Sequence, residues 1–266
     1  MLSYRHGFHA GNYADLLKHL TLALIIEYLK QKPAPIRYID THAGAGRYDI
    51  TSAMATRTGE FKAGAGAIDW ASLPAGAQPL HQIVQSTLAE GRYPGSPLIA
   101  AGLLRPRDEL RLYELHTSEY PVLQKLFARD RRVRVFPENG FGAMKTQLPM
   151  KQGRALVLMD PSYERRQDYT DVAEALAEGL RRMSTAVVAL WYPIVDPKST
   201  ERLIKQVTRL APGDSLRAEL HLNGSGPGMR ACGMLVLNAP WTLAAELTQI
   251  LEPMALQLNA RLNLTA

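Results

Sequence analysis

The sequence predicts an α/β protein with a mostly parallel, seven-stranded sheet and an antiparallel hairpin near its carboxyl end. Apolar runs expected as strands alternate with stretches of helical periodicity such as Val172, Leu176, Leu180 and Met183, and such alternation is typical of parallel sheets. Two late strand patterns are joined by the glycine-rich loop 223–230, which indicates a hairpin. The seven expected strands are 37–40, 109–115, 133–137, 155–160, 186–192, 216–222 and 234–237.

The length and composition indicate one domain. With 266 residues and 46% hydrophobic content, the chain is long enough to bury a full core. We therefore expect a single domain over 1–266. Residues 49–105 show little strand pattern and many Ala, Gly and Pro, which predicts an inserted helical subdomain of short helices and loops.

The first element expected is a helix that follows a loop ending at Gly11. Asn12 is a suitable N-cap, and Asp15 stands three residues further on, as in a capping box. Lys18 and His19 flank the apolar stripe of this helix in its second turn. The stripe consists of Leu17, Leu20, Leu24, Tyr28 and Leu29.

A glycine loop follows the first expected strand. Gly44 and Gly46 allow the backbone to approach a ligand closely, but a dinucleotide fingerprint would need a third glycine where Asp49 stands. A hydride-transfer function is therefore disfavoured. Asp40 ends the strand ahead of the glycines, as acidic residues do in the nucleoside-binding loops of S-adenosylmethionine enzymes. A terminal hairpin on a parallel sheet is also the pattern of S-adenosylmethionine methyltransferases.

A second carboxylate, Glu114, ends the strand at 109–115. A carboxylate at the carboxyl end of the second strand of a doubly wound sheet commonly accepts hydrogen bonds from ribose hydroxyls, and Glu114 fits that position. The alternative is a capping or surface acid.

The segment Asp160-Pro-Ser-Tyr-Glu164 follows the apolar run at 155–159 directly. The Asp160 carboxylate and the Pro161 carbonyl offer two acceptors that point the same way, and Tyr163 adds a flat apolar face. Such a pocket suits a planar ring that carries an amino group, because two acceptors favour the pyramidal, nucleophilic form of the amine. The alternative is an ordinary strand that ends in a proline turn, with Tyr163 as packing.

The formal charge of +6 and the pI near 9.4 indicate an anionic partner. Arg165 and Arg166 follow the Asp160 turn at once, and this position favours a phosphate-binding role. A second cluster either holds phosphates or is a solvated surface. It consists of Arg129, Arg131, Arg132 and Arg134.

Other classes of protein are disfavoured. No apolar segment approaches ~18 to 20 residues and the chain does not start like a signal peptide, so we expect a cytoplasmic protein. Cys232 is the only cysteine, which excludes an internal disulfide or a multi-cysteine zinc site. His6 and His9 form the only close histidine pair, which we interpret as facing a loop or a partner. No metal is expected.

Several segments resemble one known family. The start Met1 to Asn12, the loop Asp40 to Tyr48, the turn Tyr93 to Ala100 and the segment Ala189 to Pro193 are similar to those of the bacterial RlmJ family. These motifs span nearly the whole chain. The resemblance implies a class I methyltransferase with a Rossmann-like fold. It would transfer a methyl group from S-adenosylmethionine to the N6 amine of one adenine, adenine 2030, in 23S ribosomal RNA.

The resemblance also implies roles for individual residues. Asp160 matches the catalytic acid, with Pro161 and Tyr163 beside it, and Tyr4 matches a residue at the entrance for the target base. The expected substrate contacts are Tyr4, Tyr163, Arg165 and Arg166. The expected cofactor contacts are Lys18, His19, Asp40, His42, Gly44, Gly46, Ser96, Glu114, Asn139, Gly140 and Asp160.

The chain departs from the family pattern at two positions. Asn139 stands where the family usually has Asp, which alters the hydrogen bonds available to the adenine of the cofactor. Ser162 replaces the second proline of Asp-Pro-Pro-Tyr. The alternative functions are a DNA adenine-N6 methyltransferase, a protein glutamine methyltransferase, and a catalytically impaired RNA-binding protein. We expect a monomer whose partner is 23S ribosomal RNA. The sequence leaves open which nucleotide context is recognised, and whether the substrate is free RNA or an assembly intermediate.

Overall fold

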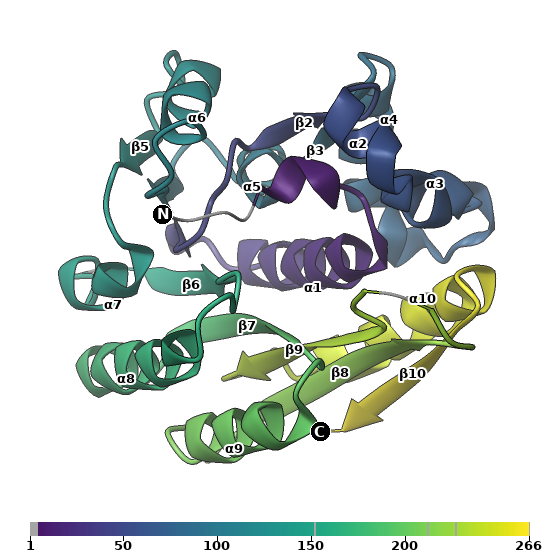
Figure 1. Cartoon of the computed structure of the whole chain (residues 1–266). Helices are drawn as coiled ribbons and strands as arrows, with labels where there is room; N and C mark the ends of the chain where they lie inside the picture. The colour runs from purple at the N-terminus through teal and green to yellow at the C-terminus, as the bar shows by residue number, and fades with distance from the viewer. Residues whose placement is uncertain (1–4, 152, 212, 227, 266) are drawn as a thin grey trace.

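The computed structural model describes residues 5–151, 153–211, 213–226 and 228–265, and its main feature is an eight-stranded sheet (Figure 1). The strand order is β10-β8-β9-β7-β6-β1-β4-β5. Neighbouring strands from β7 through β6, β1 and β4 to β5 are parallel, whereas β9, β8 and β10 pair antiparallel. The strands are β1 (Ile36–Asp40), β4 (Glu109–Tyr113), β5 (Val133–Phe136), β6 (Arg154–Met159), β7 (Val187–Pro193), β8 (Ser215–Leu222), β9 (Ala231–Leu237) and β10 (Ala260–Thr265).

The mostly parallel sheet with its antiparallel hairpin is confirmed, but the expected number of strands was one too low. The additional strand, β10, pairs with the outer side of β8. Its sequence alternates between inward residues such as Leu262 and Leu264 and exposed residues such as Arg261. This alternation is typical of a half-buried strand, but the strand is short and follows a helix almost directly.

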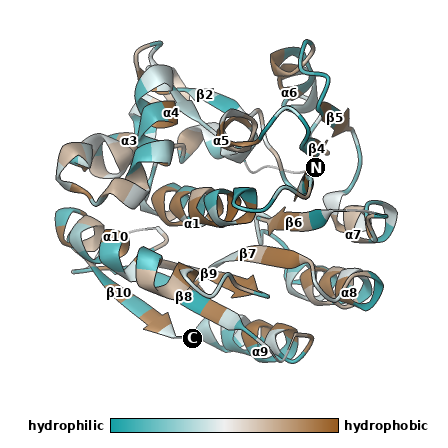
Figure 2. Cartoon of the chain, turned by 180° about the vertical axis from the view of Figure 1, so that it is seen from behind, coloured by the Kyte–Doolittle hydropathy of each residue, from teal (hydrophilic) through white to brown (hydrophobic). Residues whose placement is uncertain are grey.

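Helices cover both faces of the sheet (Figure 1). On one face lie α1 (Tyr13–Lys30), α5 (Ser96–Leu103) and α10 (Leu243–Gln257); on the other lie α7 (Ala143–Thr146), α8 (Gln167–Arg182) and α9 (Pro197–Thr208). Strand β6 shows why the sheet has two cores. Leu156 and Leu158 pack into the core on the α1 side, and the alternate residues Ala155, Val157 and Met159 pack into the core on the α8 side. Figure 2 shows both α1 and β7 as strongly hydrophobic.

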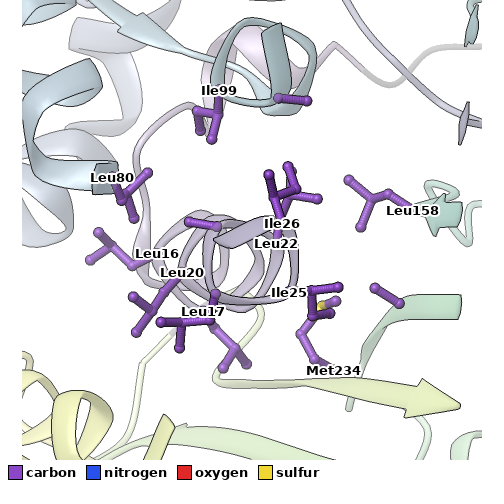
Figure 3. Close-up of a cluster of buried hydrophobic side chains, with 14 of the residues drawn as sticks. Leu16, Leu17, Leu20, Leu22, Ile25, Ile26, Leu80, Ile99, Leu158 and Met234 are labelled. Carbon is purple, nitrogen blue, oxygen red and sulfur yellow. The ribbon is translucent and has the colours of Figure 1, made fainter. Parts of the chain in front are cut away.

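Helix α1 is buried almost all round rather than along a single stripe (Figure 3). Leu16, Leu17 and Leu22 lie on different sides of the helix and are all inaccessible to solvent. Helix α1 is enclosed because it contacts α5, α10 and β9. A helix in this position normally carries no charge, so the buried Asp15, Lys18 and His19 need specific partners. Within the described part of the chain, no helix is both long and apolar enough to cross a membrane.

The segment between β1 and α5 forms short helices and a small ribbon. In the ribbon, β2 (Arg47–Asp49) pairs antiparallel with β3 (Arg92–Pro94), and the Gly95 amide donates to the Gly46 carbonyl at 2.9 Å. The ribbon and this hydrogen bond, together called the Gly46–Gly95 clasp, place the start of α5 beside the glycine loop. Between the two ribbon strands lie α2 (Ala53–Thr58), α3 (Glu60–Ala63), α4 (Gln78–Leu88) and three 3-10 turns. The remaining helix, α6 (Tyr120–Leu126), lies between β4 and β5.

Candidate active site

A narrow hollow lies at the carboxyl ends of the adjacent strands β1, β4 and β6. Its wall includes His42 and Gly44 after β1, Glu114 after β4, and Asp160 after β6. Helices α1 and α5 complete the wall. Ligands of open α/β sheets bind at this edge, where parallel strands end and the chain turns into loops and helices.

The glycine loop has the conformation that its residues predict. Gly44 and Gly46 both have positive φ, +59° and +74°, which L side chains rarely adopt. The Gly44 amide donates to Glu114 Oε2 at 2.7 Å, so the loop is fixed to the end of the neighbouring strand. Gly44 lines the hollow, whereas Gly46 holds Gly95 through its carbonyl and packs against Leu123. Gly46 therefore does not line the hollow but lies behind its wall, where it supports the loop.

Two backbone amides fix the orientation of the Glu114 carboxylate, one at each oxygen. Oε1 accepts from the His116 amide at 2.6 Å, and Oε2 accepts from the Gly44 amide. Burial raises the pKa of Glu114, and the two amide hydrogen bonds oppose that rise. Each oxygen keeps a second lone pair, so Glu114 can still accept hydrogen bonds from two hydroxyl groups.

Asp40 lies beneath the hollow rather than on its wall, which differs from the contact expected from the sequence. Its side chain is completely buried and accepts hydrogen bonds from Tyr38 Oη at 2.6 Å, Ser96 Oγ at 2.7 Å and the His42 amide at 3.3 Å. Burial raises the pKa of Asp40 to about 6, although the Tyr38 and Ser96 hydrogen bonds favour the charged form. Asp40 thus fixes Ser96 and His42, which do line the hollow.

Asp160 belongs to a buried chain of charges. Lys18 Nζ lies 2.6 Å from Asp160 Oδ2 and 2.8 Å from Asp15 Oδ1. Asp15 also accepts from His6 Nε2 at 2.9 Å and from the Gly11 amide at 2.8 Å. Burial alone would lower the pKa of Lys18, but the two carboxylates raise it well above its usual value. Lys18 therefore stays charged and fixes one oxygen of Asp160.

His19 and His42 are neutral at ordinary pH, because burial lowers their pKa values to about 3 and about 4. His19 Nδ1 lies 3.2 Å from Tyr93 Oη, and His19 Nε2 is buried without a hydrogen-bond partner in the described part of the chain. Both rings line the narrow hollow. An unpaired buried nitrogen of this kind is costly unless a ligand or water meets it.

Asn139 and Gly140 line a small hollow that adjoins the first and shares His42, Glu114 and Pro161 with it. Asn139 Oδ1 accepts from the Phe141 amide at 3.1 Å and so caps a 3-10 turn, Gly140–Gly142. Gly140 packs directly on the end of β1, since a Cβ there would lie 1.7 Å from the Thr41 carbonyl oxygen. Only glycine permits this approach.

The turn after β6 is strained at one residue. Tyr163 has φ +52°, which is uncommon for a side chain larger than glycine. Its hydroxyl donates to the Trp191 carbonyl at 3.0 Å, and its ring packs against Tyr169 at a centroid distance of 4.8 Å. Such outliers cluster at functional sites, where the surrounding structure holds them in place. Asp160 and Ser162 line both the narrow hollow and a wider one, on whose wall Tyr163 lies.

The arginines expected to bind phosphates lie in different places in the structure. Arg166 lines the wide hollow, whereas the Arg165 guanidinium is paired with Asp168 at 2.8 Å and lines the Asn139 hollow. Three arginines of the cluster precede β5 and Arg134 is the second residue of that strand, so the cluster lies at the edge of the sheet opposite to Asp160. Arg132 is an internal clamp that binds Asp130 and the carbonyls of Ala101 and Leu104. Tyr4 lies outside the described residues.

Sequence reasoning missed Asp15 and Trp191 as members of this site. Asp15 was taken only as part of a cap, although Asp15, Lys18 and His19 share one face of a helix that is otherwise apolar. Charged residues in such a helix indicate a buried network. Trp191 lies on both hollows, where its indole nitrogen is buried without a partner in the described part of the chain. The His6–Asp15 contact also corrects the interpretation of His6 as merely facing a loop or a partner.

The mostly parallel sheet with its carboxyl-terminal antiparallel hairpin is the fold of class I methyltransferases. A family model described as "Ribosomal RNA large subunit methyltransferase D, RlmJ" matches residues 33–262. The chain belongs to this RlmJ family of methyltransferases.

Relatives and a solved structure support this membership. The chain is 45% identical over 258 residues to Ribosomal RNA large subunit methyltransferase J of Escherichia coli (strain K12), covering 94% of this chain and 92% of that one. The protein of the same name from Haemophilus influenzae is 43% identical with the same coverage. A crystal structure of a Legionella pneumophila protein matches with a TM-score of 0.91 and 32% identity, over 97% of this chain and 98% of that one.

Proposed function

We propose that this protein transfers a methyl group from S-adenosylmethionine to the N6 amine of an adenine in 23S ribosomal RNA, at the position 2030 that the family resemblance implies. One observation carries the proposal. Asp160 lies on the wall shared by the narrow hollow, which Glu114 also lines, and the wide hollow, which Tyr163, Tyr169 and Trp191 line. A carboxylate in that position can reach an amine from the wide side and a cofactor from the narrow side.

The narrow hollow suits S-adenosylmethionine. Glu114 has unused lone pairs for the two ribose hydroxyls, and the close packing of Gly140 on Thr41 keeps the neighbouring hollow open for a flat ring. His19 lines the same hollow, and its Nε2 has no hydrogen-bond partner among the described residues. Bound S-adenosylmethionine would supply an electrophilic methyl group on a positively charged sulfur.

The residues around Asp160 would prepare the amine of a flipped adenine. Lys18 occupies Oδ2 of Asp160, which leaves Oδ1 to accept one N–H of the amine, and the Pro161 carbonyl would accept the other. Two acceptors draw the nitrogen away from conjugation with the ring and expose its lone pair. The Tyr163 and Trp191 rings would cover the base and limit access of water. The nitrogen loses a proton only after the new bond has formed, so Asp160 acts as an acceptor rather than as a strong base.

The test is incubation of the protein with labelled S-adenosylmethionine and 23S RNA fragments, followed by nucleoside mass analysis. We expect N6-methyladenosine at one position. Asp160→Asn should reduce turnover by about a thousandfold or more while the cofactor still binds, because it replaces one acceptor by a donor. A DNA of the same sequence and a glutamine-containing peptide serve as competitors. Preferred methylation of either one, or unimpaired turnover by Asp160→Asn, would overturn the proposal.

Ser162→Pro tests whether the departure from the family pattern disables the site. Because residue 162 supplies neither acceptor, we expect activity within about tenfold of wild type, equivalent to ~1.4 kcal/mol in the barrier. A wild-type protein that binds the cofactor but transfers no methyl group, with turnover restored by Ser162→Pro, would instead show an RNA-binding protein with an impaired site.

A further inference from the structure

The wide hollow extends well beyond the space beside Asp160. Its volume is about 630 Å³, against about 130 Å³ for the narrow hollow. The two hollows share a wall that includes Asp160 and Trp191. Tyr163 lines only the wide hollow. The remaining wall is formed by the start of α8, the turn between β7 and α9, the loop between β8 and β9, the start of α1 with the residues before it, and α3. One flipped base beside Asp160 leaves this outer part unused.

The outer part offers a flat apolar surface. Tyr169 lies in the first turn of α8, with its ring packed on Tyr163, and Pro193 and Val195 lie beside it on the wall. Val195 is 69% exposed, so its side chain is accessible to a ligand in the hollow. Aromatic and apolar surfaces of this kind bind nucleobases by stacking, whatever the base.

Two arginines on the wall of the wide hollow, Arg166 and Arg230, can attract a phosphodiester. Most acids on its wall are already engaged: Glu60 by His9 and Asn12, and Asp196 by the amides that begin α9. Arg166 lies on the same wall and forms no ion pair shorter than 4.0 Å within the described residues. Arg166 lies close enough to Asp196 to contribute to the lowered pKa of that carboxyl, after its hydrogen bonds with Ser199 and Lys198. An exposed guanidinium without a close partner can bind a phosphate oxygen pair.

We propose that the outer part of the wide hollow is a second nucleotide site, which takes the nucleotide next to the flipped adenine. Its base would lie against Tyr169 and Val195, and its phosphate would meet Arg166. The site would select single-stranded RNA and would position the target adenine through its neighbour. This inference rests on the proposed function, because it assumes that an adenine occupies the inner part.

The experiment compares kcat/KM for methyl transfer to adenosine monophosphate and to dinucleotides with the extra nucleotide on either side. We expect one dinucleotide order to exceed the mononucleotide by about tenfold or more, within the range for stacking of one base. Val195→Asp should reduce that ratio to within about threefold of one, because a carboxylate would repel the phosphate and disrupt stacking. Val122→Asp is the matched control, since Val122 is 50% exposed on α6 and lies outside both hollows.

Equal kcat/KM for the mononucleotide and both dinucleotides would overturn the second site, as would a Val195→Asp ratio equal to that of Val122→Asp. Failure of the proposed function has a different signature, namely no transfer to any adenine-containing RNA. In that case, binding of dinucleotides that contain 2-aminopurine, followed by fluorescence, still tests the site. Binding that Val195→Asp weakens at least fivefold and Val122→Asp leaves unchanged supports it, and binding equal in both variants overturns it.

Discussion

At the scale of single residues, the site depends on how burial is balanced by neighbouring charges. Lys18 is buried but stays charged because two carboxylates contact it, whereas His19 is buried one residue later and is neutral. Glu114 and Asp40 both have raised pKa values, because burial outweighs the hydrogen bonds that they accept. The protonation state of each of these four groups therefore depends on its own burial and on the charges and hydrogen bonds next to it.

Glu114→Gln should weaken binding of S-adenosylmethionine by about 1 to 3 kcal/mol, which is the scale of lost hydrogen bonds to a charged group. Both oxygens of Glu114 face backbone amides, so the amide nitrogen of Gln would place a donor against a donor. Calorimetric titration measures the dissociation constant. Glu119→Gln, which removes the same charge from the same hollow, should change it by less than about threefold. An unaltered constant in Glu114→Gln would remove Glu114 from the cofactor site.

Asp40 should make stability fall as the pH rises. Its pKa is about 6 in the folded protein and 3.8 as the ordinary value, so the folded state binds the proton more tightly. Stability is then fully present below pH 3.8 and is lost as the pH rises through 6, by roughly 3 kcal/mol on the linkage relation. Urea unfolding at several pH values would show the wild type losing this stability relative to Asp40→Asn. A constant difference between the two across pH 4 to 7 would contradict the raised pKa.

At the scale of elements, short loops with glycine at fixed points hold the site together. The turn after β5 packs Gly140 on the end of β1, and the Gly46–Gly95 clasp returns the chain to the start of α5. Both contacts are made by the backbone. Their geometry depends on the absence of a Cβ atom, which the backbone angles and the close approaches show.

Gly140→Ala should reduce both stability and cofactor affinity, because its Cβ would lie 1.7 Å from the Thr41 carbonyl oxygen and would push the turn from β1. We expect a loss of about 2 kcal/mol or more in the free energy of unfolding, the scale of overpacking at a rigid backbone contact. Gly142→Ala is the matched control in the same turn, where a Cβ meets no atom within 4 Å. Thermal unfolding and calorimetry measure both variants. Equal behaviour of the two would show that the β1 end can move to accept the methyl group.

At the scale of the whole molecule, the site lies where parallel strands end, and the antiparallel strands extend the sheet on one side. Strand β10 closes that side and packs against α10. The opposite edge ends at β5. The strands that end at the narrow hollow, β1, β4 and β6, therefore lie apart from β10, the outermost antiparallel strand.

Leu262→Ala should lower the free energy of unfolding by about 1 to 2 kcal/mol and leave cofactor binding intact. Leu262 packs into the α1-side core from β10, on the far side of the sheet from β4. Arg261→Ala is the control on the same strand, where the side chain is exposed. Chemical unfolding with calorimetry separates the two effects. A lower affinity of Leu262→Ala for the cofactor would show that this edge of the sheet is coupled to the site.

The sequence by itself determined the class of fold, the glycine loop and the polar residues that stand at the ends of the central strands. These features are local: apolar runs alternate with helical periodicity, and Asp40, Glu114 and Asp160 each follow an apolar run that must be a strand. Because parallel strands end at one edge, the convergence of His42, Glu114 and Asp160 follows from strand order alone. The alternation in β10 was also present in the sequence, but six residues after a helix are too short a pattern to identify a strand.

Only the tertiary structure decided how the charges pair and which residues stand behind the wall. Lys18 and Asp160 are 142 residues apart in the sequence, and no periodicity indicates that they meet at 2.6 Å. Likewise, Asp40 and Gly46 lie behind the hollow, and the arginines at 129–134 lie at the wrong edge of the sheet, because side-chain direction and strand polarity act only once the strands are assembled. Local patterns specify elements, but contacts between distant elements depend on packing, which one sequence does not display.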